Sequence, residues 1–354
     1  MKQYKAAIVG YGGMGRWHNQ GICKTDRIVF AGVYDINPER MDLALSDGIQ
    51  KKYSSYDDML LDNDISVVVV ATPNNFHLEQ VCKALEAGKL VICEKPVAMT
   101  SMELQEMMDC AKRTNGLFTI HQNRRVDADF LEMRDVVEKG LLGEVFEIES
   151  RVTGSRGIPE GWRQYTVAGG GMMLDWGVHL IDQLVLMMSP KKVTDVYCEM
   201  YHVNYKECDD GFKMIMHFED GPSATIEVGT SHFILAPRWY VCGDLGSMII
   251  QSWDCHGKVV RAKEHEVTFE EEIIYTKAGP TRTMAPRAKN TIEEIELDGD
   301  LWKSDYDIFY RNIADVLDGS AKLRVTPDEA MRVMKIMEAA FESDRTRSVV
   351  KCNI

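Results

Sequence analysis

The chain has 354 residues, of which 45% are hydrophobic and 27% are charged, and its formal net charge is −14 at pH 7. This length allows two domains with separate cores, and the charged fraction is ordinary for a globular protein. The negative charge repels phosphate backbones and anionic lipid surfaces, so we expect no nucleic-acid partner and no membrane partner.

The N-terminal sequence and the cysteines indicate a cytoplasmic protein. A strand-like run begins at Lys5, which leaves no room for the apolar segment of a signal peptide, and no apolar run approaches the length that spans a bilayer. The nine cysteines include no CxxC pair, a pattern typical of reduced thiols rather than of a disulfide framework or a zinc site. The nine histidines are also dispersed, so we predict no metal site.

Five short apolar runs separated by amphipathic stretches occupy the first third of the chain. They cover residues 5–10, 28–35, 65–73, 89–96 and 117–122. The apolar run 67–71 is typical of a strand covered on both faces, and the alternation with helical patterns predicts a parallel sheet of βαβ units. Before the fifth run, Thr100 and Glu103 are spaced as a capping box and Gly116 marks a helix end.

A glycine turn follows the first predicted strand. Gly10, Gly12 and Gly15 fit the G-x-G-x-x-G pattern, in which glycine permits a tight turn and a close approach of the backbone to a pyrophosphate. Asp35 ends the second strand about 20 residues after the last glycine, as the dinucleotide fingerprint requires. This context favours dinucleotide binding over the alternative of a purely structural turn.

Asp35 also bears on the choice of cofactor. Its carboxylate accepts hydrogen bonds from a ribose 2′-OH and repels a 2′-phosphate, and Ile36 supplies no positive charge. We therefore predict NAD, with NADP less favoured. Arg40 is long enough to reach a phosphate, and helix capping is the alternative role for Asp35.

The segment "EKP", residues 94–96, places two charges where the fourth strand ends. Ligands of open parallel sheets bind outside the carboxyl ends of the strands, and residues 71–77 lie at another such end. We expect Glu94 and Lys95 to face the nicotinamide side of this crevice, with Pro96 fixing the turn; a surface role in solubility is the alternative. The predicted cofactor contacts are Gly10, Gly12, Gly13, Met14, Gly15, Asp35, Ile36, Arg40, Thr72, Pro73, Asn74, His77, Glu94, Lys95 and Gln122.

A second polar pair interrupts the apolar stretch 172–188. Asp175 and His179 are spaced i, i+4 after a loose glycine segment, so they share one helix face. A histidine there can take or return a hydroxyl proton, and a nearby carboxylate can orient it or bind a substrate hydroxyl. An interior helix with one satisfied histidine is the alternative, and Asp182 has a structural role in either case. Residues 122–124 face the same crevice or form a polar hinge between domains.

The pattern changes after residue 123. A helical segment at 127–140 precedes longer alternating strands, which predicts an α+β domain at 124–354 with a large open, mainly antiparallel or mixed sheet and helices on one face. Together with a Rossmann domain at 1–123, this gives an α/β fold class. Residues 275–300 lack clear periodicity and admit three interpretations: a substrate loop, an inter-subunit arm, or, as we favour, an ordinary solvated loop.

These motifs together resemble the Gfo/Idh/MocA oxidoreductases over nearly the whole chain. The matching pieces are "GYGGMG", "ATPNNFH", "EKP" and "GWRQYTVAGGGMMLDWGVHLID". The resemblance implies that Lys95, Asp175 and His179 form a catalytic triad beside the nicotinamide. It further implies that the second domain binds substrate on one side of its sheet and a partner subunit on the other, as a homodimer or homotetramer, with C-terminal helices able to pack back on the first domain. The implied substrate-binding residues are Lys95, Asn123, Arg124, Trp162, Arg163, Asp175 and His179.

The leading hypothesis is an NAD-dependent dehydrogenase that oxidises a secondary hydroxyl of a sugar, glycoside or cyclitol. His179 would accept the hydroxyl proton, Lys95 would polarise the oxygen, and Asp175 would hold the substrate and tune the histidine. Two alternatives share the fold: an NAD-dependent glycosidase that oxidises a ring hydroxyl transiently, and a non-catalytic dinucleotide sensor. The proton-transfer groups argue against the sensor.

Overall fold

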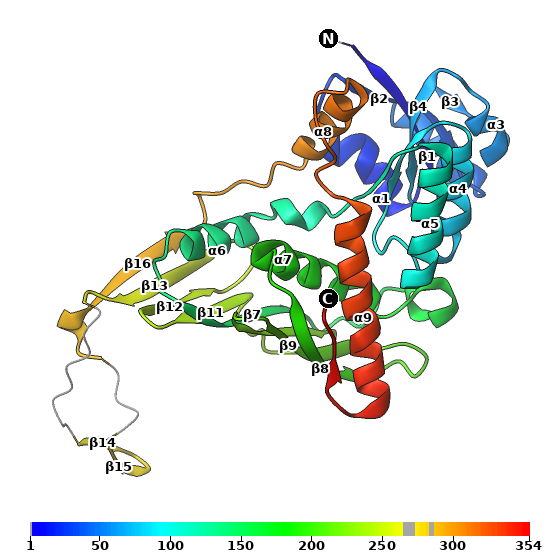
Figure 1. Ribbon diagram of the computed structural model, residues 1–354. Helices are drawn as coiled ribbons and strands as arrows, with labels where there is room; N and C mark the ends of the chain where they lie inside the picture. Colours follow the sequence, from blue (N-terminus) through cyan, green and yellow to red (C-terminus); the bar gives the residue numbers. More distant parts are fainter. Residues whose placement is uncertain (1, 265–272, 283–286) are drawn as a thin grey trace.

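The computed structural model describes residues 2–264, 273–282 and 287–354, and two large sheets dominate it (Figure 1). The first sheet is built from the N-terminal third of the chain, and the second from residues after 144. In the part of the chain that the structure describes, no helix combines the length and apolar character needed to cross a membrane.

The first sheet has six parallel strands in the order β3-β2-β1-β4-β5-β6. The five predicted strands are β1 (Tyr4–Val9), β2 (Ile28–Tyr34), β4 (Ile65–Val70), β5 (Leu90–Cys93) and β6 (Phe118–Ile120), and the sixth is β3 (Lys51–Lys52). The strand β3 consists of two exposed lysines, so it carries no apolar signal. The strand order reverses between β1 and β4, which is where such sheets open a crevice at their carboxyl edge.

Short helices join these strands. They are α1 (Gly13–Trp17), which continues into the π-helical turn η1 (His18–Ile22), α2 (Pro38–Ser46), α3 (Tyr56–Leu60), η2 (Asn74–Phe76), α4 (His77–Glu86) and α5 (Ser101–Thr114). The hydroxyl of Thr100 caps α5 by accepting from the Glu103 main-chain N–H. The predicted capping box is incomplete, because the Glu103 carboxylate accepts from Met99 instead, at 2.7 Å. The left-handed residue that ends α5 is Asn115, with φ of 51°, rather than Gly116.

The second sheet has nine strands in the order β16-β13-β12-β11-β7-β10-β9-β8-β17. Its only parallel pair is β7 with β10 among the described strands, so the sheet is mixed and mainly antiparallel, as predicted. The strands are β7 (Val145–Thr153), β8 (Val193–Tyr201), β9 (Gly211–Phe218), β10 (Ser223–Gly229), β11 (Trp239–Gly243), β12 (Gly246–Ile250), β13 (His256–Ala262), β16 (Ile292–Asp298) and β17 (Val350–Lys351). The expectation of a loop throughout 275–300 is wrong for β16, whose charged residues hide its alternation, and for the short hairpin at 274–281.

The first two helices of the second half lie between the two sheets (Figure 1). Figure 1 shows α6 (Ala128–Glu138) and α7 (Val178–Met188) on the face of the second sheet that is turned to the first. The one-turn elements η3 (Asn123–Val126) and η6 (Met173–Gly177, π-helical) precede these helices, and η4 (Trp162–Gln164) and η5 (Thr166–Ala168) lie in the loop after β7. The segment after β13 contains the hairpin of β14 (Ile274–Thr276) and β15 (Gly279–Thr281), followed by η7 (Lys289–Thr291).

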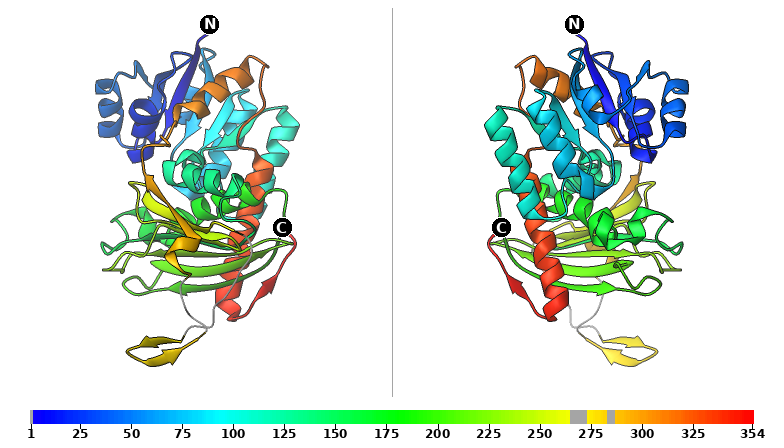
Figure 2. Two further views of the ribbon diagram at one scale, coloured as in Figure 1. Left: turned by 90° about the vertical axis from the view of Figure 1, so that its left-hand side faces the viewer. Right: turned by 90° about the vertical axis from the view of Figure 1, so that its right-hand side faces the viewer.

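The last two helices connect the sheets. Figure 2 shows α8 (Asp307–Leu317) beside the first sheet and α9 (Pro327–Thr346) alongside the second. The ring of Tyr310 on α8 meets Phe30 of β2 edge-on, with centroids 5.8 Å apart. A complete capping box of Thr326 and Glu329 begins α9, which contacts α5, α7 and β8. These contacts join the first sheet and its helix α5 to the helices and strands of the second half.

Candidate active site

The glycine turn after β1 has the shape that a pyrophosphate requires. Gly10 has φ of +88°, and a Cβ there would lie 2.7 Å from the carbonyl oxygen of Ala71. A Cβ on Gly15 would lie 2.1 Å from the carbonyl oxygen of Gly10, so this glycine lets the helix sit against the turn. A Cβ on Gly12 would first meet the Arg40 guanidinium, at 3.8 Å, and a Cβ on Gly13 would point into open space. The turn therefore leaves its outer backbone free for a phosphate, and Met14 is half-buried beside it.

Asp35 lies buried at the end of β2 and faces this turn. Its Oδ2 accepts from the main-chain N–H of Tyr11 at 2.7 Å, and its Oδ1 accepts from that of Asn37 at 2.8 Å. The residue that caps α2 is Asn37, so the alternative capping role for Asp35 is wrong. The Arg40 guanidinium lies 3.6 Å from Oδ2 and is half exposed, and Ile36 points to solvent.

The segment after β4 braces the neighbouring loops. Both imidazole nitrogens of the buried His77 lie 3.0 Å from main-chain oxygens, one from Thr72 and the other from Pro96. The amide of Asn74 donates to the carbonyl oxygen of Gly169 at 3.0 Å. His77 and Asn74 thus position the loops around the crevice with their side chains, and Pro73 leads into η2 between them. Their contact with a cofactor remains a prediction.

Lys95, Asp175 and Arg163 form an ion-pair network at this edge. The Lys95 ammonium donates to the main-chain oxygen of Asp175 at 2.8 Å and to its Oδ1 at 3.2 Å, and the Arg163 Nε donates to the same Oδ1 at 3.2 Å. Burial alone would raise the pKa of the Asp175 carboxyl, but the two cations outweigh it and lower that pKa below its ordinary value. The ring of Trp162 lies 4.5 Å from the Arg163 guanidinium.

His179 lies buried in the first turn of α7. Burial lowers the pKa of this imidazole well below its ordinary value, and the positive charges of Lys95 and Arg124 lower it further. Its ring is therefore neutral at pH 7 and able to accept a proton. None of the hydrogen bonds found among the described residues joins Asp175 to His179, so any tuning by that carboxylate acts through space.

Four buried polar atoms near this edge have no hydrogen-bond partner in the described structure. They are His179 Nδ1, Gln122 Oε1, Asn123 Oδ1 and Arg124 Nε. Buried polar atoms are normally paired, so such orphans mark places where a ligand or water completes the bonding. This favours the interpretation of residues 122–124 as part of the crevice.

Two tryptophans that the motifs did not single out enlarge the site. The Arg124 guanidinium lies 4.2 Å from the ring centroid of Trp176 and 5.2 Å from that of Trp253. The two rings are 5.8 Å apart, and Trp176 is 5.9 Å from the ring of His179. Trp253 is half exposed and lies in the turn between β12 and β13, far from any motif in the sequence, so only the fold reveals it.

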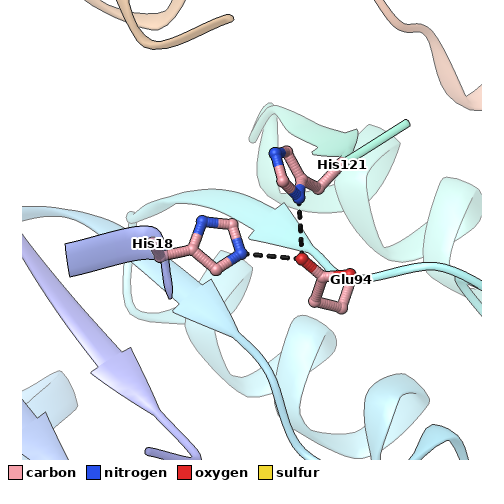
Figure 3. Close-up of side chains that lie close together, drawn as sticks. All are labelled: His18, Glu94 and His121. Carbon is pink, nitrogen blue, oxygen red and sulfur yellow. Dashed lines mark hydrogen bonds and ion pairs between the residues drawn. The ribbon is translucent and has the colours of Figure 1, made fainter. Parts of the chain in front are cut away.

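Behind Lys95, Glu94 joins two histidines in what we call the Glu94 cluster: Glu94, His18, His121 and Tyr310 (Figure 3 shows the first three). His18 Nε2 and His121 Nδ1 each lie 2.7 Å from the same Glu94 Oε1, and the Tyr310 hydroxyl bonds to His18 Nδ1. The expectation that Glu94 faces the crevice is wrong for its carboxylate, because the residue is 4% exposed and its carboxylate is bonded inward to the two histidines.

The cluster also corrects the view that the histidines are dispersed. Two histidines and one carboxylate have the composition of a transition-metal site, so the dispersal of histidines along the sequence is not a sufficient reason to predict no metal site. Their 2.7 Å separations are those of charge-assisted N–H···O⁻ hydrogen bonds. We therefore describe the cluster as hydrogen bonded.

The parallel sheet, glycine turn and acidic residue after β2 define a dinucleotide-binding protein. Residues 4–122 match the model of the Gfo/Idh/MocA oxidoreductase family with an NAD-binding Rossmann fold, and residues 130–249 match the C-terminal domain of that family. The chain belongs to the Gfo/Idh/MocA family and is an oxidoreductase that uses a nicotinamide dinucleotide.

Several relatives resemble the chain over long stretches. An NAD-binding protein from Listeria innocua superposes with a TM-score of 0.92 at 42% identity, covering 99% of this chain and all of the other. The scyllo-inositol 2-dehydrogenase (NADP⁺) IolW of Bacillus subtilis is 27% identical over 98% of this chain and 95% of its own length. The D-glucoside 3-dehydrogenase of Escherichia coli is 32% identical over 54% of this chain and 56% of its own length.

Proposed function

We propose that this oxidoreductase is an NAD-dependent dehydrogenase that oxidises a secondary hydroxyl of a sugar, glycoside or cyclitol. The observation that carries the proposal is a Lys95 ammonium bonded to Asp175 close to a buried, neutral His179, whose pKa the charge of that ammonium lowers. Relatives named for scyllo-inositol and for a D-glucoside support the substrate class. The twin rings of Trp176 and Trp253 add the kind of aromatic surface on which a sugar ring can lie.

In this proposal the residues divide the proton chemistry among them. The neutral imidazole of His179 accepts the hydroxyl proton as the C–H bond breaks. The Lys95 ammonium stabilises the negative charge that develops on the substrate oxygen. Asp175 holds that ammonium in place and keeps a carboxylate oxygen available for a second hydroxyl. The nicotinamide, when bound, supplies the acceptor for the hydride, so proton and hydride leave the substrate by separate routes.

We propose that NAD is preferred over NADP. Each Asp35 carboxylate oxygen accepts a single main-chain N–H, which leaves acceptor capacity for a ribose hydroxyl, and the buried anion repels a 2′-phosphate. Arg40 could offset that repulsion, since it lies beside the carboxylate, and one relative is named for NADP. The ratio of kcat/KM values for the two cofactors decides this point.

The test is a substrate panel of inositols, monosaccharides and aryl glucosides incubated with purified protein and NAD. Absorbance of NADH and release of the aryl group are followed in the same sample, with Lys95→Met as the inactive control. Net NADH formation supports the dehydrogenase. Aryl release without NADH would identify the glycosidase alternative instead, and silence across the panel with intact NAD binding would favour the sensor.

We further propose that residues 1–123 bind NAD and that residues 124–354 bind the substrate and form a homodimer or homotetramer through the uncovered face of the second sheet. On that face Arg151 reaches both Glu149 and Glu227, an ordered charged network that a second copy could meet. Light scattering at micromolar concentration tests this, and a monomer would contradict it. The unpaired state of all nine cysteines supports a reducing, cytoplasmic location.

A further inference from the structure

The Glu94 cluster gathers side chains from four separate parts of the fold. Glu94 follows β5, His121 follows β6, His18 begins η1, and Tyr310 lies on α8. All four residues are buried, and the mechanism above uses none of them. Lys95 is the next residue after Glu94, and its main-chain N–H donates to Glu94 Oε2 at 3.3 Å. The cluster is therefore attached directly to the main chain that carries the lysine.

Glu94 is the anion of the cluster. Burial would raise the pKa of its carboxyl, but the charge and the N–H group of His121, followed by the N–H group of His18, outweigh burial and hold that pKa well below its ordinary value. Burial, followed by the charge of His121, lowers the pKa of His18, and a neutral His18 fits its bonds, because Nε2–H donates to Glu94 while Nδ1 accepts from Tyr310. An anion buried with donor partners is stable only while those donors remain.

This charge acts on His179 from outside its own helix. The cations that face His179 are Lys95 after β5 and Arg124 in η3, and both oppose its protonation; His121 also opposes it, whereas the Glu94 carboxylate favours it. The other nearby anion, Asp175, is already bonded to Lys95 and Arg163. When His179 takes a proton, the site gains a further positive charge, and the buried carboxylate of Glu94 offsets part of it.

We propose that Glu94 is a positioning residue for this reaction: its carboxylate, fixed by His18 and His121, anchors the Lys95 main chain and offsets the positive charge formed when His179 accepts the substrate proton. This inference rests on the proposed dehydrogenase function. Because the Glu94 carboxylate is buried and bonded to His18 and His121, its effect reaches the reaction through Lys95 and His179.

The experiment removes the charge and keeps the shape. Glu94→Gln should lower kcat for alcohol oxidation by about tenfold, equivalent to about 1.4 kcal/mol in the barrier, because His179 becomes a weaker base. The acid limb of the kcat–pH profile should also move to lower pH, since a less basic imidazole loses its proton earlier. Glu94→Asp retains the charge and should restore the limb. The KM for NAD should change little.

Tyr310→Phe is the matched control, because it deletes a hydrogen bond of the same cluster and keeps the carboxylate. Its kcat–pH profile should match that of the unaltered protein, whatever its melting temperature. Should Glu94→Gln fail to fold by circular dichroism, Glu94→Ser removes the same charge and leaves room for water. The proposal would be overturned if the acid limb of the kcat–pH profile did not shift in Glu94→Gln, or if it shifted as far in Tyr310→Phe as in Glu94→Gln.

A second measurement separates this proposal from the proposed function. The titration of the His179 ring, followed by NMR of labelled histidines and assigned with His179→Asn, needs no substrate. Its midpoint should fall in Glu94→Gln relative to the unaltered protein even if no substrate has been found, and an unchanged midpoint contradicts the charge-balancing role. Stoichiometric zinc or iron in the purified protein that disappears in Glu94→Gln would also overturn the proposal, because Glu94 would then be a metal ligand.

Discussion

Replacing Lys95 by methionine tests the centre of the proposed mechanism. The change keeps an unbranched stem but removes the ammonium that donates to the Asp175 main-chain oxygen at 2.8 Å and to its Oδ1 at 3.2 Å. Loss of one donor to a developing oxyanion costs about 10²–10³ in kcat, or roughly 3–4 kcal/mol. We expect a loss of that size in alcohol oxidation.

The structure also predicts an effect of this variant on stability. Sequence alone gives Lys95 no buried partner, whereas in the fold its side chain is 11% exposed and that of Asp175 is 19% exposed. Hydrogen bonds to charged groups contribute about 1.5–3 kcal/mol each, and Arg163 stays beside the carboxylate to offset part of the loss. We expect Lys95→Met to lower the free energy of unfolding by about 1–2 kcal/mol.

The assay measures kcat, NAD affinity and urea unfolding on one preparation. Lys5→Met is the control, because Lys5 and Asp64 form an ion pair of 2.8 Å whose side chains are 51% and 72% exposed. It should leave kcat unchanged and alter stability by less than about 0.5 kcal/mol. Normal turnover in Lys95→Met would refute the catalytic role. Lost turnover in a protein already unfolded at the assay temperature would point to a structural ion pair instead.

Four further variants or conditions test the remaining interpretations. His179→Ala should lower kcat by about 10²–10⁴ with little change in NAD affinity, and near-normal turnover would assign the base elsewhere. Asp35→Ser should narrow the preference for NAD over NADP through KM for the cofactor, and equal use of both by the unaltered protein would contradict the assignment. Trp253→Ala should raise KM for a ring substrate by about tenfold at similar kcat, if its half-exposed ring binds sugar; an unchanged KM would place it outside the site. The pKa values of His18, His77 and His179 are lowered in the fold, so below about pH 6.5 the unfolded chain binds more protons than the folded chain. The free energy of unfolding should therefore fall between pH 7.5 and pH 5.5, by up to about 1.4 kcal/mol per pH unit for each histidine. Equal unfolding free energies at both pH values would contradict this.

The sequence predicted the elements whose pattern is local. The run Val67–Val70 is apolar because β4 is covered on both faces. The spacing of the glycines predicted the turn at Gly10, where the positive φ favours glycine. Where the pattern was weak, the prediction failed. The two lysines of β3 and the acidic strand β16 gain their structure from pairing with a neighbouring strand, which leaves no mark on their own composition.

The site divides in the same way. Asp175 lies in the π-helical turn η6 and His179 lies in α7 directly after it, so their spacing was enough to predict one helical segment, and their joint role in catalysis stays a prediction. Trp253 meets Trp176 only because the second sheet brings the β12–β13 turn against η6, and no local signal encodes that meeting. Interactions between residues far apart in the chain depend on how the sheets pack, and a single sequence does not display that packing.

The motif "EKP" shows why adjacency in sequence misleads about function. Residues that continue a strand point alternately to its two sides, so Glu94 and Lys95 should face opposite directions rather than act as a pair. In the fold Lys95 reaches outward to Asp175, and Glu94 turns inward to His18 and His121. The Glu94 carboxylate can point inward because two imidazole N–H groups donate to the buried charge. Removing those donors should therefore weaken the position of Lys95 as well, since one length of main chain joins the cluster to the reacting ammonium.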